Sequence, residues 1–204
     1  MKRYDCVKSL AARISANTLV VSNLGNTARM LEEIRPSDAN FHPVNLGCCT
    51  ALAMGLALAL PHRKVVALDG DGNLLLNLSV LADLASVAPP NLLIIVFDNE
   101  YYESGGGFPS VTSGVVDLEG MAKGAGLKDT ATVRGLKGFE QALTKKLKAK
   151  GPCFLVAKVE KDGKIISPRT ASNFQETKFK FIRHIEKSEG VSIVLRTKGA
   201  RVVI

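Results

Sequence analysis

Short apolar runs alternate along the chain with segments whose apolar residues recur every three or four positions. The apolar runs are rich in Val, Ile and Leu and occupy residues 18–21, 64–68, 92–97, 130–133 and 153–159. The helical patterns lie between them, at residues 27–34, 50–60, 73–87, 117–126 and 138–148. Residues 41–45 are expected to be extended as well. Such alternation is typical of an α/β fold, and it predicts a three-layer sandwich around a central, mostly parallel sheet of about six strands.

A single domain accounts for this pattern. The chain has 204 residues, of which 46% are hydrophobic, and this is enough for one substantial core. No repeat or Pro/Ser-rich linker divides the alternating region. We therefore expect one domain, with a core at about 19–159 and a C-terminal extension at 160–204. Within the extension, the pattern suggests a helix at 174–185 and a hairpin at 191–204.

Neither end of the chain nor its longest apolar stretch indicates a membrane or secretion signal. Residues 1–14 carry charges throughout and predict an amphipathic helix. The helix at 50–60 has no charged residue, so we expect it to be buried on most sides, and it is too short for a bilayer, which needs about 20 residues. The four cysteines show no CxxC spacing. We expect a cytoplasmic protein with reduced thiols.

The net charge of +8 raises the question of a nucleic-acid partner. The basic residues concentrate at 145–150 and beyond residue 158. At 145–150 they continue an amphipathic pattern at the C-terminal end of a helix, where the helix dipole favours cations. No binding motif or aromatic platform accompanies them. An exposed helix face is therefore favoured, and no nucleic-acid partner is expected.

The residues around Gly70-Asp71-Gly72 carry the clearest chemical signal. This turn follows the apolar run at 64–68, Asn99 follows the run at 92–97, and Asn23 follows the first run. Ligands of parallel sheets bind outside the carboxyl ends of the strands, so these side chains should share one site. One carboxylate and one amide suit Mg²⁺, and the glycines let backbone N–H groups approach a phosphate. The sequence therefore predicts a Mg²⁺-diphosphate site.

Several of these residues also have a plain structural interpretation. Asp71 could be a turn or helix-capping residue. The three glycines at 105–107 form either a flexible loop or a lid over the site. Cys48, at the start of a helix, could be a reactive thiol, although small buried cysteines are common. His42 could orient an anionic substrate, but a loop histidine without a role is the more frequent case.

Two stretches of the chain resemble a known family. The spacing from Gly70-Asp71-Gly72 to Asn99 is similar to the thiamine diphosphate signature. The segments LDGDGNLLLNLSVLADLA and IVFDNEYYESGGGFPS resemble the pyrophosphate-binding domain of sulfopyruvate and phosphonopyruvate decarboxylases. The likeness extends over about residues 19–159. Strand, turn, helix and a Gly-rich loop in this order make the combination specific, whereas a Gly-Asp-Gly turn alone is weak.

The resemblance implies thiamine diphosphate and Mg²⁺ as cofactors and assigns residues to each. The metal ligands would be Asp71, Asn99 and the main-chain carbonyl of Tyr101. Asn73 would offer its backbone N–H to the diphosphate, with its side-chain amide as a second candidate group. Near Gly47 a backbone carbonyl would receive the cofactor's amino group, and Cys48 takes the place of a supporting methionine. The expected cofactor-binding residues are thus Gly47, Cys48, Gly70, Asp71, Gly72, Asn73, Asn99 and Tyr101.

The resemblance also implies a function and a partner. The family's activating glutamate belongs to a separate pyrimidine-binding domain, and the acidic pair Glu32-Glu33 should not be given this role. We expect a β subunit of a two-subunit 2-oxo acid decarboxylase that works with a pyrimidine-binding α subunit. By resemblance its anionic 2-oxo acid substrate would be sulfopyruvate, or next phosphonopyruvate. It should form a homodimer alone and an α₂β₂ or larger complex with that partner.

Two alternatives remain at this stage. A 2-oxoacid:ferredoxin oxidoreductase β subunit would share the Gly-Asp-Gly motif, but the cysteine spacing argues against its iron–sulfur clusters. A non-catalytic cofactor-binding protein would keep the fold without the chemistry, and the unusual Cys48-Cys49 pair keeps this hypothesis open.

Overall fold

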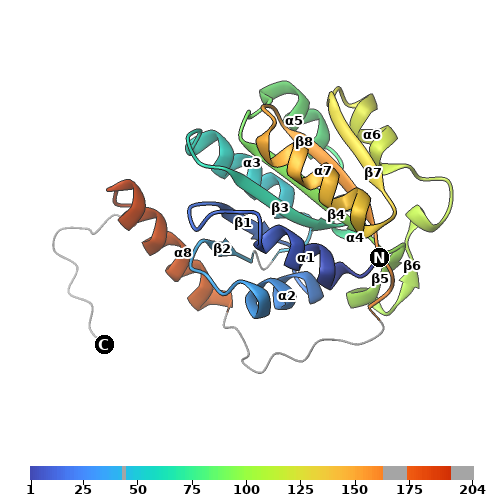
Figure 1. Ribbon diagram of the computed structural model, residues 1–204, viewed down its shortest axis with the longest axis horizontal. Coiled ribbons are helices and arrows are strands. Elements are labelled where there is room, and N and C mark those ends of the chain that lie inside the picture. The colour runs from blue at the N-terminus through green and yellow to red at the C-terminus, as the bar shows by residue number, and fades with distance from the viewer. Residues whose placement is uncertain (43–44, 163–173, 194–204) are drawn as a thin grey trace.

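The computed structural model describes residues 1–42, 45–162 and 174–193, and its centre is a six-stranded sheet (Figure 1). The strand order is β2-β1-β3-β4-β8-β7, and all neighbours run parallel. The bounds are β1 Leu19–Ser22, β2 Asn40–Phe41, β3 Val65–Gly70, β4 Leu92–Asp98, β7 Asp129–Val133 and β8 Cys153–Lys158. The predicted α/β sheet of about six parallel strands is confirmed.

Helices cover both faces of this sheet and complete the three layers (Figure 1). One face packs against α1 Arg3–Ala11, α2 Asn26–Ile34 and α7 Leu136–Lys148. The other packs against α3 Cys49–Ala59, α4 Asp71–Leu75, α5 Val80–Val87 and α6 Leu118–Gly124. The expected N-terminal amphipathic helix is therefore α1, which buries Cys6, Val7 and Leu10 against the sheet side.

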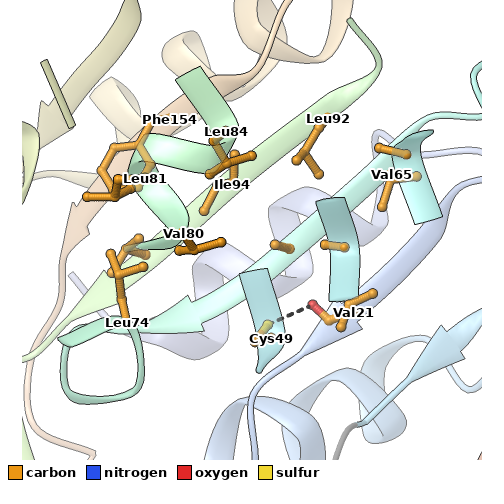
Figure 2. Close-up of a cluster of buried hydrophobic side chains, with 14 of the residues drawn as sticks. Val21, Cys49, Val65, Leu74, Val80, Leu81, Leu84, Leu92, Ile94 and Phe154 are labelled. Atoms are coloured by element: carbon orange, nitrogen blue, oxygen red, sulfur yellow. Dashed lines mark hydrogen bonds between the residues drawn. The ribbon is translucent and has the colours of Figure 1, made fainter. Parts of the chain in front are cut away.

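The central strands explain the continuous apolar runs in the sequence. Every residue of β4 is buried, because alternate side chains enter the two cores on opposite faces of the sheet. Leu92 and Ile94 belong to the core beneath α3 and α5, whereas Leu93 and Ile95 belong to the core beneath α1 and α7. Figure 2 shows the first of these cores, in which Leu81 and Leu84 of α5 lie over the strands.

Helix α8, Phe174–Glu189, lies at the edge of the sheet beside β2 (Figure 1). The rings of Phe41 and Phe181 stack with their centroids 5.2 Å apart, and Arg63 forms an ion pair with Glu189 at 3.0 Å. The helix expected at 174–185 is thus present and longer than expected. The hairpin expected at 191–204 falls largely on residues outside the described range.

The single helix expected at 73–87 is wrong, because two helices, α4 and α5, replace it. Asn77 lies at the break, where its side-chain Nδ2 donates to the carbonyl of Gly47 at 3.1 Å and its Oδ1 accepts from Ser79 at 2.9 Å. Asn and Ser side chains compete for hydrogen bonds that a continuous helix would need. The first helix also begins earlier than expected, at Asp71.

The expectation that the helix at 50–60 is buried on most sides is also wrong. Leu52 and Leu58 of α3 are 38% and 48% exposed, and Gly55 is exposed with them. The helix packs on the sheet along one side only, which carries Cys49, Ala53 and Ala57. The absence of charged residues in α3 therefore reflects an apolar outer side and not burial of the whole helix. No helix in the described ranges is long and apolar enough to cross a membrane.

The segment after β4, expected to be a long loop, contains a small hairpin. Strand β5, Tyr101–Tyr102, pairs antiparallel with β6, Phe108–Pro109. Two short 3₁₀ turns flank the second strand, η1 at Glu103–Gly105 and η2 at Val111–Ser113. The glycines at 106 and 107 adopt positive φ angles of 99° and 76° in the connection.

Candidate functional site

The chain reverses its direction of travel across the sheet at β1, and the candidate site lies there. From β1 the chain goes outward to β2 and then returns to β3 on the other side. The carboxyl ends of β1 and β3 therefore form a topological switch point, where parallel sheets bind ligands. A cavity of about 240 Å³ lies at this place. Its wall includes residues from the ends of β1, β3 and β4 and from the following hairpin, among them Asn23, Gly70, Asp71, Gly72, Asn73, Asn99, Tyr101 and Tyr102.

The two glycines of the turn are needed because other groups approach them closely. A Cβ atom at Gly70 would lie 2.9 Å from the side-chain nitrogen of Asn23. A Cβ atom at Gly72 would lie 2.5 Å from a ring carbon of Tyr102. The oxygen of the Asn23 side chain is buried, and no partner for it is found within the described ranges. The two glycines thus let the side chains of Asn23 and Tyr102 pack closely on the turn.

Asp71 is 3% exposed and begins α4 at the end of β3. Its Oδ2 accepts hydrogen bonds from the hydroxyl of Ser110 at 2.6 Å and from that of Thr112 at 3.1 Å. Burial raises the pKa of Asp71, and the nearby carboxylate of Asp98 raises it further, while these hydroxyls oppose the rise. A bound cation would favour the ionised carboxylate at this place.

Asn99 and Tyr101 line the same cavity as Asp71. The side-chain oxygen of Asn99 accepts from the backbone N–H of Tyr101 at 3.1 Å, which closes a tight turn. Glu100, between them, adopts a positive φ of 66°, a conformation that is costly for a residue with a side chain. The structure thus brings together the three residues expected to bind the metal.

Asn73 joins the turn to the loop before α3. Its side-chain oxygen accepts from the N–H of Gly47 at 2.9 Å, and its Nδ2 donates to Asp69 at 2.6 Å. Burial raises the pKa of Asp69, while hydrogen bonds from Thr50, Asn73 and Gly70 oppose the rise. Because its side-chain amide holds these two partners, Asn73 keeps its backbone N–H as the group expected to meet a diphosphate.

Gly47 and Cys48 lie beside the cavity but are not part of its wall, whereas their neighbour Leu46 is. Gly47 has a φ of 75° and its carbonyl accepts from Asn77. Cys48 is half-buried, and Cys49 points into the core, where its thiol donates to the carbonyls of Val21 and Leu68 at 3.5 Å (Figure 2). The expected support of the cofactor by Cys48 stays a prediction.

His42 does not reach the cavity. It is 1% exposed, and its ring nitrogens contact the hydroxyl of Ser22 and, at 2.7 Å, the carboxylate of Glu32. A side chain with both nitrogens engaged inside the protein cannot also orient a substrate. The more frequent interpretation, a histidine with a structural place, is the one that the geometry favours.

Sequence reasoning missed three side chains around the site. Ser110 and Thr112 bind Asp71, and their one signal is a pair of hydroxyl residues just after the Gly-rich loop. Arg3 lines the cavity from α1 and pairs with Glu103 at 3.0 Å and with Asp162 at 3.3 Å. Arg3 lies far from Glu103 in the sequence, and no local pattern connects the two.

The donor set fits a Mg²⁺-diphosphate group. Mg²⁺ prefers oxygen ligands and takes one or two carboxylates, and the wall of the cavity offers the carboxylate of Asp71, the amide oxygen of Asn99 and backbone oxygen. Gly70, Gly72 and Asn73 line the cavity where α4 begins, and the first N–H groups of a helix favour an anion. The buried Asn23 oxygen is an acceptor, so a cation or a ligand N–H or O–H group can satisfy it, whereas a phosphate oxygen cannot.

Comparison with known proteins places this site in a family. The family described as "Thiamine pyrophosphate enzyme, C-terminal TPP binding domain" matches residues 25–157. "Sulfopyruvate decarboxylase subunit beta" from Methanocaldococcus jannaschii is 30% identical over 92% of this chain and 98% of that protein. "Phosphonopyruvate decarboxylase" from Streptomyces viridochromogenes is 33% identical over 74% of this chain but only 38% of that longer protein.

A solved structure shares the fold. The thiamine diphosphate-dependent 4-hydroxybenzoylformate decarboxylase of Rhodococcus jostii RHA1 superposes with a TM-score of 0.68 at 20% identity, over 80% of this chain and 33% of that one. The match of the family over most of the chain, together with a relative matched from end to end, leads to one conclusion. The chain belongs to the thiamine pyrophosphate enzyme family, as its C-terminal TPP binding domain.

Proposed function

We propose that this chain is the thiamine diphosphate- and Mg²⁺-binding β subunit of a two-subunit 2-oxo acid decarboxylase, with sulfopyruvate or phosphonopyruvate as its substrate. The observation that carries the proposal is the match to a sulfopyruvate decarboxylase β subunit over 98% of its length. The corresponding region is only 38% of the longer phosphonopyruvate decarboxylase. This difference supports an enzyme divided between two chains. The similarity to decarboxylases favours this function over a ferredoxin oxidoreductase.

Each part of the turn has a role in this proposal. Asp71, Asn99 and the carbonyl of Tyr101 hold Mg²⁺, and the backbone at Gly70, Gly72 and Asn73 receives the diphosphate. The burial of Asp71 and the place of Gly70, Gly72 and Asn73 in the wall of the cavity support these assignments. When bound, thiamine diphosphate supplies the nucleophile and the electron sink that a 2-oxo acid needs to lose CO₂.

The activating glutamate is assigned to the α subunit. Glu32 bonds to His42, and Glu33 accepts from the hydroxyl of Tyr4 at 3.3 Å, so both acidic residues have partners elsewhere in the fold. Glu103 lines the cavity but forms an ion pair with Arg3. We infer that a pyrimidine-binding α subunit closes the site and brings its own glutamate.

The α subunit should also hold the sulfonate or phosphonate of the substrate. Among the described residues that line the cavity, Arg3 is the one cation, and it is shared by Glu103 and Asp162. A guanidinium between two carboxylates has little remaining charge to offer an anion. A cation that recognises the substrate is therefore expected on the partner's side of the cavity.

Exposed apolar side chains support a partner at this face. Leu46 and Leu76 line the cavity and are 61% and 63% exposed, and Phe108 on the hairpin is 67% exposed. Large apolar side chains exposed around one cavity are typical of interfaces. Cognate assemblies usually have two-fold symmetry. We infer a homodimer in isolation and an α₂β₂ or larger complex with the partner.

Decarboxylation assays test this proposal. The purified chain, alone and with the α subunit, is incubated with sulfopyruvate, phosphonopyruvate and pyruvate in the presence of thiamine diphosphate and Mg²⁺, and released CO₂ is measured. We expect turnover only with both chains and only with an acid that carries the second anionic group. Turnover by the single chain would contradict the division of the enzyme.

Recovery of the partner is a second test. The tagged chain is purified from its native host and the copurifying proteins are identified by mass spectrometry. We expect a companion of comparable size together with the cofactor. Recovery of a monomer without companion or cofactor would instead favour a non-catalytic protein.

A further inference from the structure

Four polar side chains lie buried against one another behind the wall of the cavity. Asp71, Asp98, Ser110 and Thr112 are 3%, 2%, 2% and 3% exposed. Asp71 begins α4, Asp98 ends β4, Ser110 immediately precedes the turn η2, and Thr112 lies within that turn. Neither Ser110 nor Thr112 belongs to the wall of the cavity. Polar groups are buried at a cost unless they bond to one another, so this cluster needs a reason.

Both hydroxyls bond to the same oxygen of Asp71. Ser110 Oγ lies 2.6 Å from Asp71 Oδ2, and Thr112 Oγ1 lies 3.1 Å from it. The hydroxyls also contact each other at 2.7 Å. Thr112 Oγ1 also lies 2.8 Å from Asp98 Oδ1, so its single hydroxyl proton is shared between the carboxylates of Asp71 and Asp98. A carboxylate held at one oxygen by two neighbours has little freedom to rotate.

The cluster is fixed to the sheet through Asp98. The second oxygen of Asp98 pairs with Lys158 of β8 at 2.7 Å, and Lys158 also reaches Glu100 at 2.9 Å. The backbone N–H of Ser110 donates to the carbonyl of Glu100 at 2.8 Å. The segment that carries the hydroxyls is therefore attached to two adjacent strands of the sheet.

We propose that Thr112, together with Ser110, is a positioning residue that holds the carboxylate of Asp71 in the orientation required to bind the metal. The inference rests on the proposed function, in which Asp71 is a ligand of Mg²⁺. Thr112 does not touch the metal or the cofactor and acts through Asp71. Hydrogen bonds to a ligating carboxylate orient it, and loss of such a partner typically lowers metal affinity by about 10–100-fold.

The direct test is the affinity for Mn²⁺, a spectroscopic substitute for Mg²⁺, measured by electron paramagnetic resonance with saturating thiamine diphosphate on the full chain. Thr112→Val keeps the size of the side chain and removes its hydroxyl. We expect this variant to bind Mn²⁺ about 10-fold more weakly. Thr112→Ser restores the hydroxyl and should return the affinity to within about threefold of the wild type.

Thr130→Val is the matched control, because Thr130 also donates from a hydroxyl to a carboxylate, that of Glu119 at 3.2 Å, at the far edge of the sheet. It should leave Mn²⁺ affinity unchanged. If Thr112→Val fails to fold, Ser110→Ala is tested in its place, because it leaves the bond from Thr112 to Asp98 unchanged. The same loss of Mn²⁺ affinity is expected.

Each outcome has a distinct meaning. If the wild type and Thr112→Val bind Mn²⁺ equally well in the presence of the cofactor, the positioning role is overturned. The proposed function is then left intact. Equal losses in the valine variants of Thr112 and Thr130 also overturn it, because a general effect of lost stability would then suffice. A wild-type chain without Mn²⁺ binding overturns both proposals.

Discussion

The ring of Tyr102 lies so close to Gly72 that a Cβ atom on the glycine would stand 2.5 Å from ring carbon Cδ1. The contact joins the Gly70-Asp71-Gly72 turn at the end of β3 to the hairpin after β4. Tyr102 pairs with Phe108 across that hairpin, so the ring is held by its own strand as well. The position of the hairpin therefore depends on the absence of a side chain at residue 72.

Gly72→Ala should displace the ring of Tyr102 and change the shape of the cavity. We expect weaker binding of thiamine diphosphate in the presence of Mg²⁺, by about tenfold or about 1.4 kcal/mol, measured by calorimetric titration. Gly72→Ala/Tyr102→Ala, in which the new methyl group has room, should recover part of this loss. Weakening that is identical in the single and double variants would argue against the steric cause.

Gly55→Ala provides the control for that substitution. Gly55 lies on the exposed side of α3, and a Cβ atom there meets nothing within 4 Å. Alanine is favoured over glycine within a helix by roughly 0.5–1 kcal/mol. This variant should therefore bind the cofactor normally and unfold at a slightly higher urea concentration.

Asn73→Ala should destabilise the protein. The substitution removes the bond to Asp69, a buried carboxylate, and leaves the N–H of Gly47 without its acceptor. Leaving a buried polar group unpaired costs about 1–3 kcal/mol. The free energy of unfolding, measured with urea, should fall by that amount. Asn77 is half-buried and donates to the carbonyl of Gly47, so Asn77→Ala should lower the free energy of unfolding by less than Asn73→Ala does. A larger loss in Asn77→Ala would contradict this account of the Asn73 hydrogen bonds.

The cysteines should differ sharply in reactivity. Burial raises the pKa of Cys6 to about 12 and that of Cys153 to about 11, and it raises the pKa of Cys49 well above its ordinary value. A thiol with a pKa near 11 has about one thiolate in a thousand molecules at pH 8, and only the thiolate reacts. Cys48 is half-buried, so iodoacetamide should modify it first.

Mass spectrometry after timed alkylation of the native protein measures these rates. If Cys48 supports the cofactor, thiamine diphosphate with Mg²⁺ should slow its modification and leave the other three cysteines as slow as before. If Cys153 is modified as fast as Cys48, then Cys153 is not buried, or its pKa is not raised, as described here.

Much of the fold follows from the sequence because its signals are local. The runs that became β3 and β4 are apolar throughout, as strands buried on both faces must be, and the turn at Gly70 lies where β3 ends. The prediction that α3 is buried on most sides failed, because a helix without charged residues can also expose one apolar side. It also failed at Asn77, whose side-chain bond to Gly47 interrupts a helix for a tertiary reason.

The site divides in the same way. That Asp71 and Asn99 line one cavity could be predicted because each stands just after the end of a strand, whereas Tyr101 is named only through the resemblance to the family. Thr112 and Arg3 could not, because their roles arise from contacts between segments distant in the sequence. The contact between Ser110 and Asp71 depends on the path of the hairpin. The sequence of a Gly-rich segment does not predict that path.

The central claim is that Asp71 binds Mg²⁺ and thereby the diphosphate of thiamine diphosphate. Calorimetric titration of the cofactor into the wild type, into Asp71→Ala and into Asp83→Ala, whose exposed carboxylate lies on α5, tests it most directly. Each titration is done with Mg²⁺ and again with EDTA. We predict binding in the wild type and in Asp83→Ala with Mg²⁺ only, and none in Asp71→Ala. Equal affinity in the wild type and Asp71→Ala, or binding that EDTA does not affect, would contradict the account.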